Sequence, residues 1–174
     1  GYAPRLHRAN SAGATRFPEA RFDMVRIGIG MHGIGTNEKE TALLRPVEML
    51  RTVIAQVKEI PAGDSISYGR KVRVTKPTRI AVLPIGYADG LSRKLGEGNG
   101  RVWIAGKEAR TIGAICMDMC MVDVTGIPCS PGDEAVLFSD AHPLQNYARD
   151  LGTIPYEALT SISPRVKRVF VHGG

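Results

Sequence analysis

Apolar positions along the chain mostly recur with the short period of β-strands. Residues 70–75 alternate between polar and apolar, and residues 79–85 form a continuous apolar run, which is typical of a strand buried on both faces. Two further strands are expected at residues 101–104 and 109–115, on either side of a turn at residues 105–108. Short strands at this spacing predict a mainly β fold, built as a barrel or a sandwich.

Residues 46–60 fit two patterns. Their apolar positions lie at helical spacing, at Val47, Leu50, Val53, Ile54 and Val57. Alternate residues of the same segment would also share one face of a strand, and the turn-forming Pro61–Asp64 that follows suits a hairpin. Periodicity therefore leaves both a helix and a strand open.

The C-terminal third contains the clearest helix. Residues 143–151 carry apolar side chains at helical spacing, with Asp140 or Ser139 as a possible N-cap and Gly152 as the stop. A second short helical turn is expected at residues 156–162, before a strand at residues 165–171. Near the N-terminus, residues 23–31 form a strand-like run that ends in glycines.

Length and composition are those of a soluble globular protein. The chain has 174 residues, 43% apolar and 23% charged, which suits one large or two small domains. It has no apolar run approaching the roughly 20 residues of a membrane helix, and its first residues lack the apolar stretch of a secretion signal. We therefore expect a cytoplasmic protein without a membrane partner.

Cysteine and charge distribution narrow the choice of partners. Cys116, Cys120 and Cys129 are odd in number and have no paired spacing, which favours a reducing compartment over a disulfide framework. No histidine lies near them, so no metal site is expected. The net charge of +6 is scattered and aromatic residues do not interleave with it, so nucleic-acid binding is not expected either.

The candidate for chemistry is Tyr87. An apolar strand runs into Pro84–Gly90, where glycines flank the tyrosine and leave its phenol at the end of an element. Such a phenol can carry out acid–base chemistry. On the residues alone, the favoured interpretation is that Tyr87 does no more than close a turn before Asp89 and Gly90.

Six sequence blocks in a fixed order carry a resemblance to a known family. They are His7–Ala12, Asp23–Arg26 with Gly28 and Ile29, Ser67–Gly69, Ile85–Gly90, Ile115–Asp118 and Ile154–Glu157. Together they resemble the C-terminal part of alanine racemase. The resemblance implies that residues 1–39 are the end of a (β/α)8 barrel and that residues 40–174 are the family's β-barrel-like C-terminal domain.

The resemblance also implies an activity. Alanine racemases use pyridoxal 5′-phosphate to interconvert L- and D-alanine for peptidoglycan synthesis, and they work as homodimers with shared active sites. It assigns the proton-handling role to Tyr87 and a place near the substrate carboxylate to Met117 and Asp118. The cofactor-binding residues it implies are Arg26 at the pyridine nitrogen, backed by His7, and Ser11, Gly28, Ile29 and Tyr156 at the phosphate.

The sequence departs from the family pattern near the phosphate loop, where Ile27 replaces the usual proline and His32 the usual tyrosine. No lysine stands in the family's cofactor-lysine motif, so we expect this chain to be inactive by itself. The alternative is a freestanding β-barrel module for association or binding. A finished module should bury the apolar residues before residue 40, whereas the end of a larger barrel should leave them exposed.

Overall fold

The computed structural model describes residues 2–70 and 72–171. The chain divides into two compact units, Gly1–Glu48 and Met49–Gly174. The domain boundary expected after residue 39 stays a prediction.

Two extended segments of the first unit pair in parallel. His7 and Met24 form a parallel bridge, and the N–H of Arg26 donates to the carbonyl of Ala9 at 2.9 Å. The strand expected over residues 23–31 is absent: Met24 alone forms a bridge, and the 3-10 helix η2 occupies the end of the segment from Ile29. The helices of this unit are α1 (Ser11–Arg16), η1 (Pro18–Ala20), η2 (Ile29–His32) and α2 (Glu38–Thr41).

Side-chain caps and one ion pair hold these short helices. The side chain of Asn10 accepts from the N–H of Gly13 at 2.9 Å and begins α1. Arg16, at the end of α1, lies 2.8 Å from the carboxylate of Glu40 in α2. Hydrogen bonds from Thr36 and then Arg16 lower the pKa of Glu40 from its usual 4.5 to about 2, so this carboxylate is charged at neutral pH.

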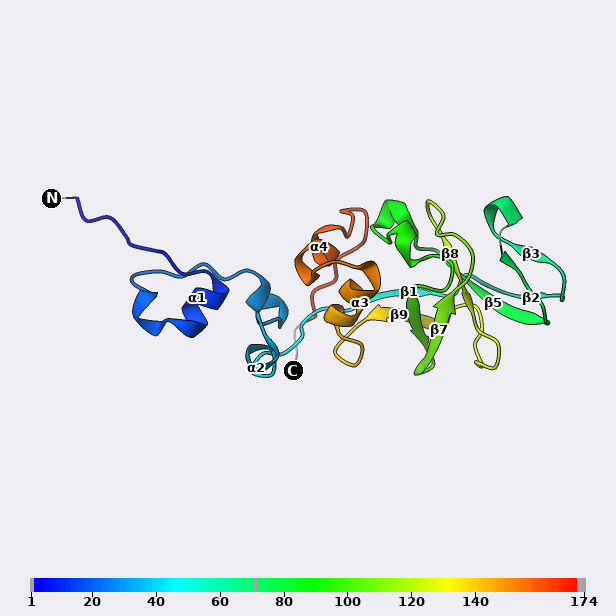
Figure 1. The fold of residues 1–174 in the computed structure, drawn as a ribbon, viewed down its shortest axis with the longest axis horizontal. Coiled ribbons are helices and arrows are strands. Elements are labelled where there is room, and N and C mark those ends of the chain that lie inside the picture. The colour runs from blue at the N-terminus through cyan, green and yellow to red at the C-terminus, as the bar shows by residue number, and fades with distance from the viewer. Residues whose placement is uncertain (1, 71, 172–174) are drawn as a thin grey trace. The chain divides into compact units, whose positions relative to one another are not determined.

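The second unit is built on a seven-stranded antiparallel sheet, which confirms the mainly β fold (Figure 1). In spatial order its strands are β1 (Leu50–Val53), β9 (Glu134–Phe138), β6 (Arg101–Ile104), β7 (Lys107–Thr111), β8 (Cys120–Asp123), β5 (Thr78–Leu83) and β2 (Gln56–Ile60). A small hairpin of β3 (Ser65–Ile66) and β4 (Val72–Arg73) is separate. Short 3-10 helices are η3 (Tyr68–Arg70), η4 (Tyr87–Asp89) and η5 (Arg93–Leu95).

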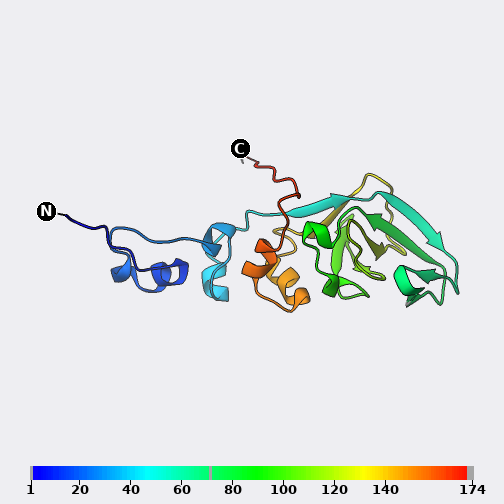
Figure 2. The same ribbon diagram turned by 90° about the horizontal axis from the view of Figure 1, so that it is seen from above.

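The two edges of the sheet come from one continuous stretch of chain. Strands β1 and β2 follow each other directly, yet β1 pairs with β9 and β2 pairs with β5 (Figure 2). Between them, the N–H of Ile54 donates to Asp133 and that of Ala55 donates to Val82. The sheet therefore curls, and the helical alternative for residues 46–60 is wrong over residues 50–60.

Other predicted strands agree with the structure where local patterns were strong. Strand β5 is buried on both faces, with Ala81 and Leu83 fully inaccessible, and β6 has the expected bounds. The hairpin between β6 and β7 turns on Ala105 and Gly106, both with positive φ. Strand β7 starts at Lys107, earlier than predicted, and also ends earlier, at Thr111, because Gly113 has a φ of +72° and turns the chain away.

Two helices lie at one end of the sheet in both views (Figures 1 and 2). Helix α3 (Leu144–Leu151) buries its apolar face and stops at Gly152, as predicted. The predicted caps are wrong, because Asp140 accepts from the N–H of Ala141 and Ser139 from that of His142. Helix α4 (Pro155–Thr160) follows. The strand predicted over residues 165–171 is absent; these residues have no regular structure.

Candidate active site

Tyr87 lies outside the core, on a turn that only glycine permits. Its side chain is 44% exposed, at the start of η4. A Cβ on the preceding Gly86 would lie 2.4 Å from the carbonyl oxygens of Cys116 and Met117. Glycine is required there because the two backbone segments approach too closely for any side chain.

The turns of Tyr87 and of Met117 are joined through their backbones. The N–H of Tyr87 donates to Cys116 at 2.9 Å, and the N–H of Ala88 donates to Met117 at 3.0 Å. The Met117 side chain is exposed beside them. The structure thus brings together three of the predicted site residues, Tyr87, Met117 and Asp118, from segments far apart in the sequence.

The carboxylate of Asp89 stabilises the Tyr87 turn through two contacts. One oxygen of its carboxylate accepts from the N–H of Gly86 at 2.8 Å, and the other lies 2.8 Å from Nε of Arg165. Arg165 also donates from Nη2 to Asp118 at 2.6 Å. These carboxylates raise the pKa of the Arg165 guanidinium, and the hydrogen bond to Asp118 is the largest cause. Sequence reasoning assigned Arg165 no role; its only signal was the basic cluster at residues 165–168.

A second phenol, Tyr68, projects from a strained turn close to the same loop. Its side chain is 79% exposed, and its neighbours Ser67 and Arg70 have φ values of +69° and +50°. Oγ of Ser67 accepts from the N–H of Ala114 at 3.0 Å, just before the Cys116 turn. Strained backbone of this kind concentrates at functional positions. The Ser67–Gly69 block signalled this residue in the sequence, without a role.

Two cysteines close to the tyrosine turns differ in how far their thiols are exposed. Cys116 is half-buried, whereas Cys120, the first residue of β8, is buried. Burial raises the pKa of the Cys120 thiol to about 12. Cys120 therefore stays protonated and acts as a small apolar side chain in the core.

The predicted phosphate ligands of the first unit also come together. Oγ of Ser11, at the start of α1, accepts from the N–H of Gly28 at 3.1 Å. The N–H of Ile29 donates to no described residue, and a Cβ on Gly28 would meet nothing within 4 Å. A hydroxyl and backbone N–H groups in open space suit a phosphate.

A cavity of ≈ 230 Å³ lies beside this loop. Ser11, Ile27, Gly30, Ile34, Glu40 and Leu44 contribute to its lining. Glu40 carries the charge of that lining, and its carboxylate pairs with Arg16, which lies outside the lining. Ile27, which replaces the family's usual proline, therefore forms part of this wall.

Arg26 is exposed two residues before Gly28, with Nη2 donating to the carbonyl of Arg8 at 3.3 Å. His7 forms no hydrogen bond with Arg26 within the described part of the chain, so the expected backing by His7 is not seen. Tyr156 belongs to the second unit, in α4, where its side chain is half-exposed. The donor groups of Ser11, Gly28, Ile29 and Arg26 fit a phosphorylated pyridine; the cofactor assignments themselves stay predictions.

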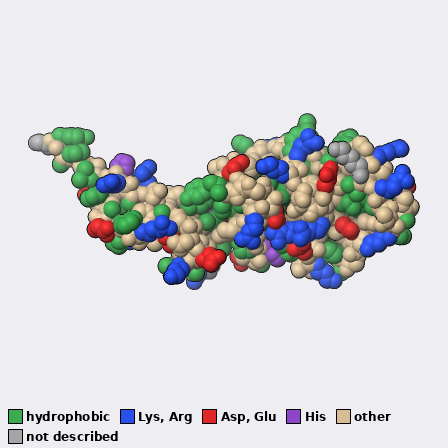
Figure 3. Space-filling view, viewed as in Figure 1, with side chains coloured by type: hydrophobic (Ala, Val, Ile, Leu, Met, Phe, Trp, Pro, Cys, Tyr) green, Lys and Arg blue, Asp and Glu red, His purple; other side chains and the backbone are tan. Residues whose placement is uncertain are grey.

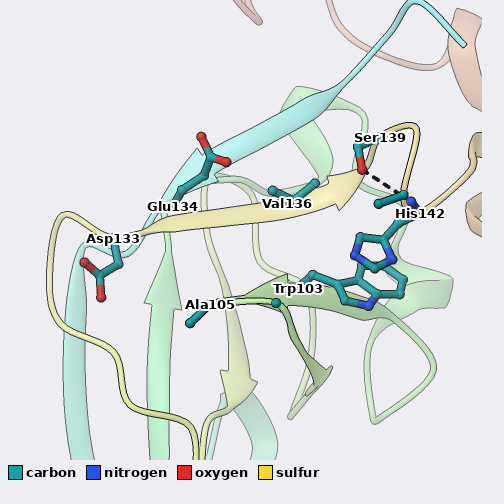
Figure 4. A pocket seen from close by; sticks show the side chains of 9 residues that line it. Trp103, Ala105, Asp133, Glu134, Val136, Ser139 and His142 are labelled. Carbon is teal, nitrogen blue, oxygen red and sulfur yellow. Dashed lines mark hydrogen bonds between the residues drawn. The ribbon is translucent and has the colours of Figure 1, made fainter.

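A larger hollow lies elsewhere on the second unit and holds none of the predicted site residues. It measures ≈ 550 Å³ and lies between β9 and the β6–β7 turn (Figure 4). The rings of Trp103 and His142 stack there at 3.8 Å, and Ser139 accepts from the N–H of His142. Its volume alone therefore does not mark the catalytic region.

The second unit carries charged side chains of both signs (Figure 3). Basic and acidic side chains are interspersed over the face of the second unit seen in Figure 3. Within residues 2–70 and 72–171, no three His, Cys, Asp or Glu side chains are grouped to hold a metal ion. No helix in the same ranges has the length and apolar character needed to cross a bilayer.

Comparison with known proteins identifies the class of protein to which this curled sheet and its tyrosine turns belong. A family model described as "Alanine racemase, C-terminal domain" matches residues 47–170. The alanine racemase of Desulfosudis oleivorans is 41% identical over 96% of this chain. The chain spans 45% of that relative's length.

Solved structures of alanine racemases superpose closely on this chain. The alanine racemase of Streptomyces lavendulae superposes with a TM-score of 0.87 at 38% identity, over 97% of this chain and 46% of its own. That of Bartonella henselae, solved with covalently bound pyridoxal phosphate, has a TM-score of 0.85 at 32% identity, over 98% and 48%. This chain belongs to the alanine racemase family, and it corresponds to the family's C-terminal part.

Proposed function

We propose that this chain is the C-terminal part of an alanine racemase, which interconverts L- and D-alanine with pyridoxal 5′-phosphate. In this proposal the whole protein is a cytoplasmic homodimer with shared active sites that supplies D-alanine for peptidoglycan. One observation carries the proposal: the Tyr87 turn is bonded to the Met117 turn while its phenol stays outside the core.

When bound, pyridoxal phosphate draws electrons from an attached amino acid and so makes its Cα proton easier to remove. Ser11, Gly28 and Ile29 would hold the phosphate, joined by the hydroxyl of Tyr156. Arg26 would face the pyridine nitrogen; because a guanidinium keeps its proton, that nitrogen would stay largely unprotonated. Met117 and Asp118 would lie beside the substrate carboxylate.

Two exposed phenols of this chain are candidates for moving the Cα proton. Tyr87 is the one that the resemblance implies. Tyr68 is more exposed and lies on a strained backbone, and its turn is bonded to the same loop through Ala114. Both hydroxyls are therefore tested together.

The test is replacement of each tyrosine by phenylalanine in the full-length protein. Loss of the proton carrier should lower kcat by about 10²–10⁴-fold, while the variant keeps its fold and its bound cofactor, as judged by circular dichroism and the cofactor absorbance. A loss confined to Tyr68→Phe would move the role from Tyr87 to Tyr68. Full activity in both variants would contradict the proposal that this chain supplies the proton carrier.

The alternative of a freestanding module is disfavoured by the first unit. Its large apolar side chains lie exposed, among them Leu6, Phe17, Phe22, Met24, Ile27, Met31 and Leu43. A finished domain rarely leaves so much apolar surface uncovered. The exposure is what we expect of extended segments and short helices that normally pack within a larger barrel.

The missing cofactor lysine gives a direct test on the isolated chain. After incubation with pyridoxal phosphate and reduction with borohydride, we expect no stoichiometric lysine adduct by mass spectrometry, and no racemisation of alanine. A relative containing the lysine motif is the positive control. A stoichiometric adduct together with racemisation would show that this chain carries the chemistry alone.

A further inference from the structure

Arg165 links the two turns of the candidate active site. Nε of its guanidinium lies 2.8 Å from Asp89, on the Tyr87 turn, and Nη2 lies 2.6 Å from Asp118, on the Met117 turn. Asp118 and Arg165 are about half-exposed, whereas the side chain of Asp89 is only 12% exposed. One side chain thus spans two segments that belong to different parts of the sequence.

The segment that presents Arg165 is itself firmly held. The guanidinium of Arg168 donates to the carbonyls of Ile162, Ser163 and Val166 at 2.6–2.9 Å. The N–H of Ser163 donates to the carbonyl of Asp89 at 3.0 Å. Arg165 therefore projects from a segment that is held by hydrogen bonds. Its two contacts connect that segment to the Tyr87 turn and to the Met117 turn.

The guanidinium suits this task better than an ammonium group. Its planar fork donates in two directions at once, so Nε and Nη2 can serve different carboxylates. A lysine at the same place would carry the charge but act as a point donor to one carboxylate at a time. The geometry thus calls for the shape of arginine as well as its charge.

We propose that Arg165 is a positioning residue that sets the spacing between the Tyr87 turn and the Met117–Asp118 turn. Its consequence for catalysis rests on the proposed function, whereas the coupling of the two turns does not. Arg165 acts through Asp89 and Asp118. It holds the phenol of Tyr87 at a constant distance from the groups that would contact the substrate carboxylate.

The test uses amide hydrogen exchange in the full-length protein. The N–H groups of Tyr87 and Ala88 report directly, because they form the bonds between the two turns. In Arg165→Met their exchange should rise by about five-fold or more, since two charge-assisted contacts are lost. Arg165→Lys should give an intermediate value.

The matched control is Arg110→Met. Arg110 is also about half-exposed and lies 2.7 Å from a carboxylate, that of Glu108 on its own strand. It should leave exchange at Tyr87 and Ala88 unchanged. If Arg165→Met also leaves those amides unchanged, or if both variants raise exchange equally, the proposed positioning role is wrong.

A second readout separates this inference from the proposed function. In full-length protein, Arg165→Met should lower kcat by about ten-fold with little change in KM, because misplacing a reacting group affects the transition state most. If the unaltered full-length protein does not racemise alanine, the proposed function fails, and the exchange result alone decides the coupling. If racemisation is normal in Arg165→Met despite faster exchange, the catalytic part of the inference is overturned.

Discussion

Replacing Gly90 by alanine should destabilise the second unit far more than replacing Gly126, although both residues have positive φ. The values are +102° and +76°. A Cβ on Gly90 would lie 2.2 Å from the carbonyl oxygen of Ser161, whereas one on Gly126 would meet nothing within 4 Å. The pair therefore separates the cost of backbone conformation from the cost of a close approach.

The magnitudes follow from those two contributions. Left-handed backbone costs an alanine about 1–2 kcal/mol at either position. At Gly90 the Ser161 carbonyl must also move, which adds about 1–3 kcal/mol, as for other overpacked sites. We expect Gly90→Ala to lose about 2–5 kcal/mol of unfolding free energy and Gly126→Ala about 1–2 kcal/mol.

The assay is urea unfolding followed by tryptophan fluorescence. Trp103 is the only tryptophan of the chain and lies in β6, so its signal reports on the second unit. Linear extrapolation then gives the free energy of unfolding for each variant. If the two variants unfold at the same urea concentration with the same slope, Gly90 and Ser161 do not approach as closely as the structure shows, and the reasoning is refuted.

Three further predictions concern other parts of the chain. Oγ1 of buried Thr111 bonds the carbonyl of Leu95 and the N–H of Gly100, so Thr111→Val should cost about 1–3 kcal/mol in urea unfolding and Thr111→Ser clearly less. With a thiol reagent at pH 8, half-buried Cys116 should react first and buried Cys120, whose pKa is about 12, only on unfolding; equal rates would contradict this. Because the folded pKa of Glu40 is about 2 against 4.5, its stabilising contribution should be complete above pH 4.5 and lost as the pH falls towards 2. Acid titration of hydrogen exchange in the first unit should show this loss, and Glu40→Gln should abolish it.

Local sequence patterns predicted those helices and strands in which a single periodicity fits the whole element. The apolar run that became β5 is buried on both faces, and the helical spacing before Gly152 became α3, because in each case one periodicity fits and the other does not. Residues 50–60 defeated the same reasoning. They switch partners at Ile54, from β9 to β5, and no local pattern encodes that switch.

The candidate active site was likewise predictable from the sequence only in part. Motif order alone grouped Tyr87, Met117 and Asp118, and the structure joins them through backbone bonds that periodicity cannot predict. Arg165 was missed because its partners, Asp89 and Asp118, are distant in sequence and each lies in a different turn. The strand expected near Arg165 is absent because no described strand pairs with residues 165–171; the Arg168 side chain instead bonds carbonyls of its own segment.

The pairing of the first and last strands has a consequence for how the chain is made. Arg51 of β1 finds its partner Glu134 of β9 83 residues later, so the earliest strand of this unit waits for the ribosome to deliver the latest one. Such distant pairings slow folding, since a long loop must close before they gain any energy. Until then β1 presents an open edge, and this interval is when a nascent chain is most prone to aggregate.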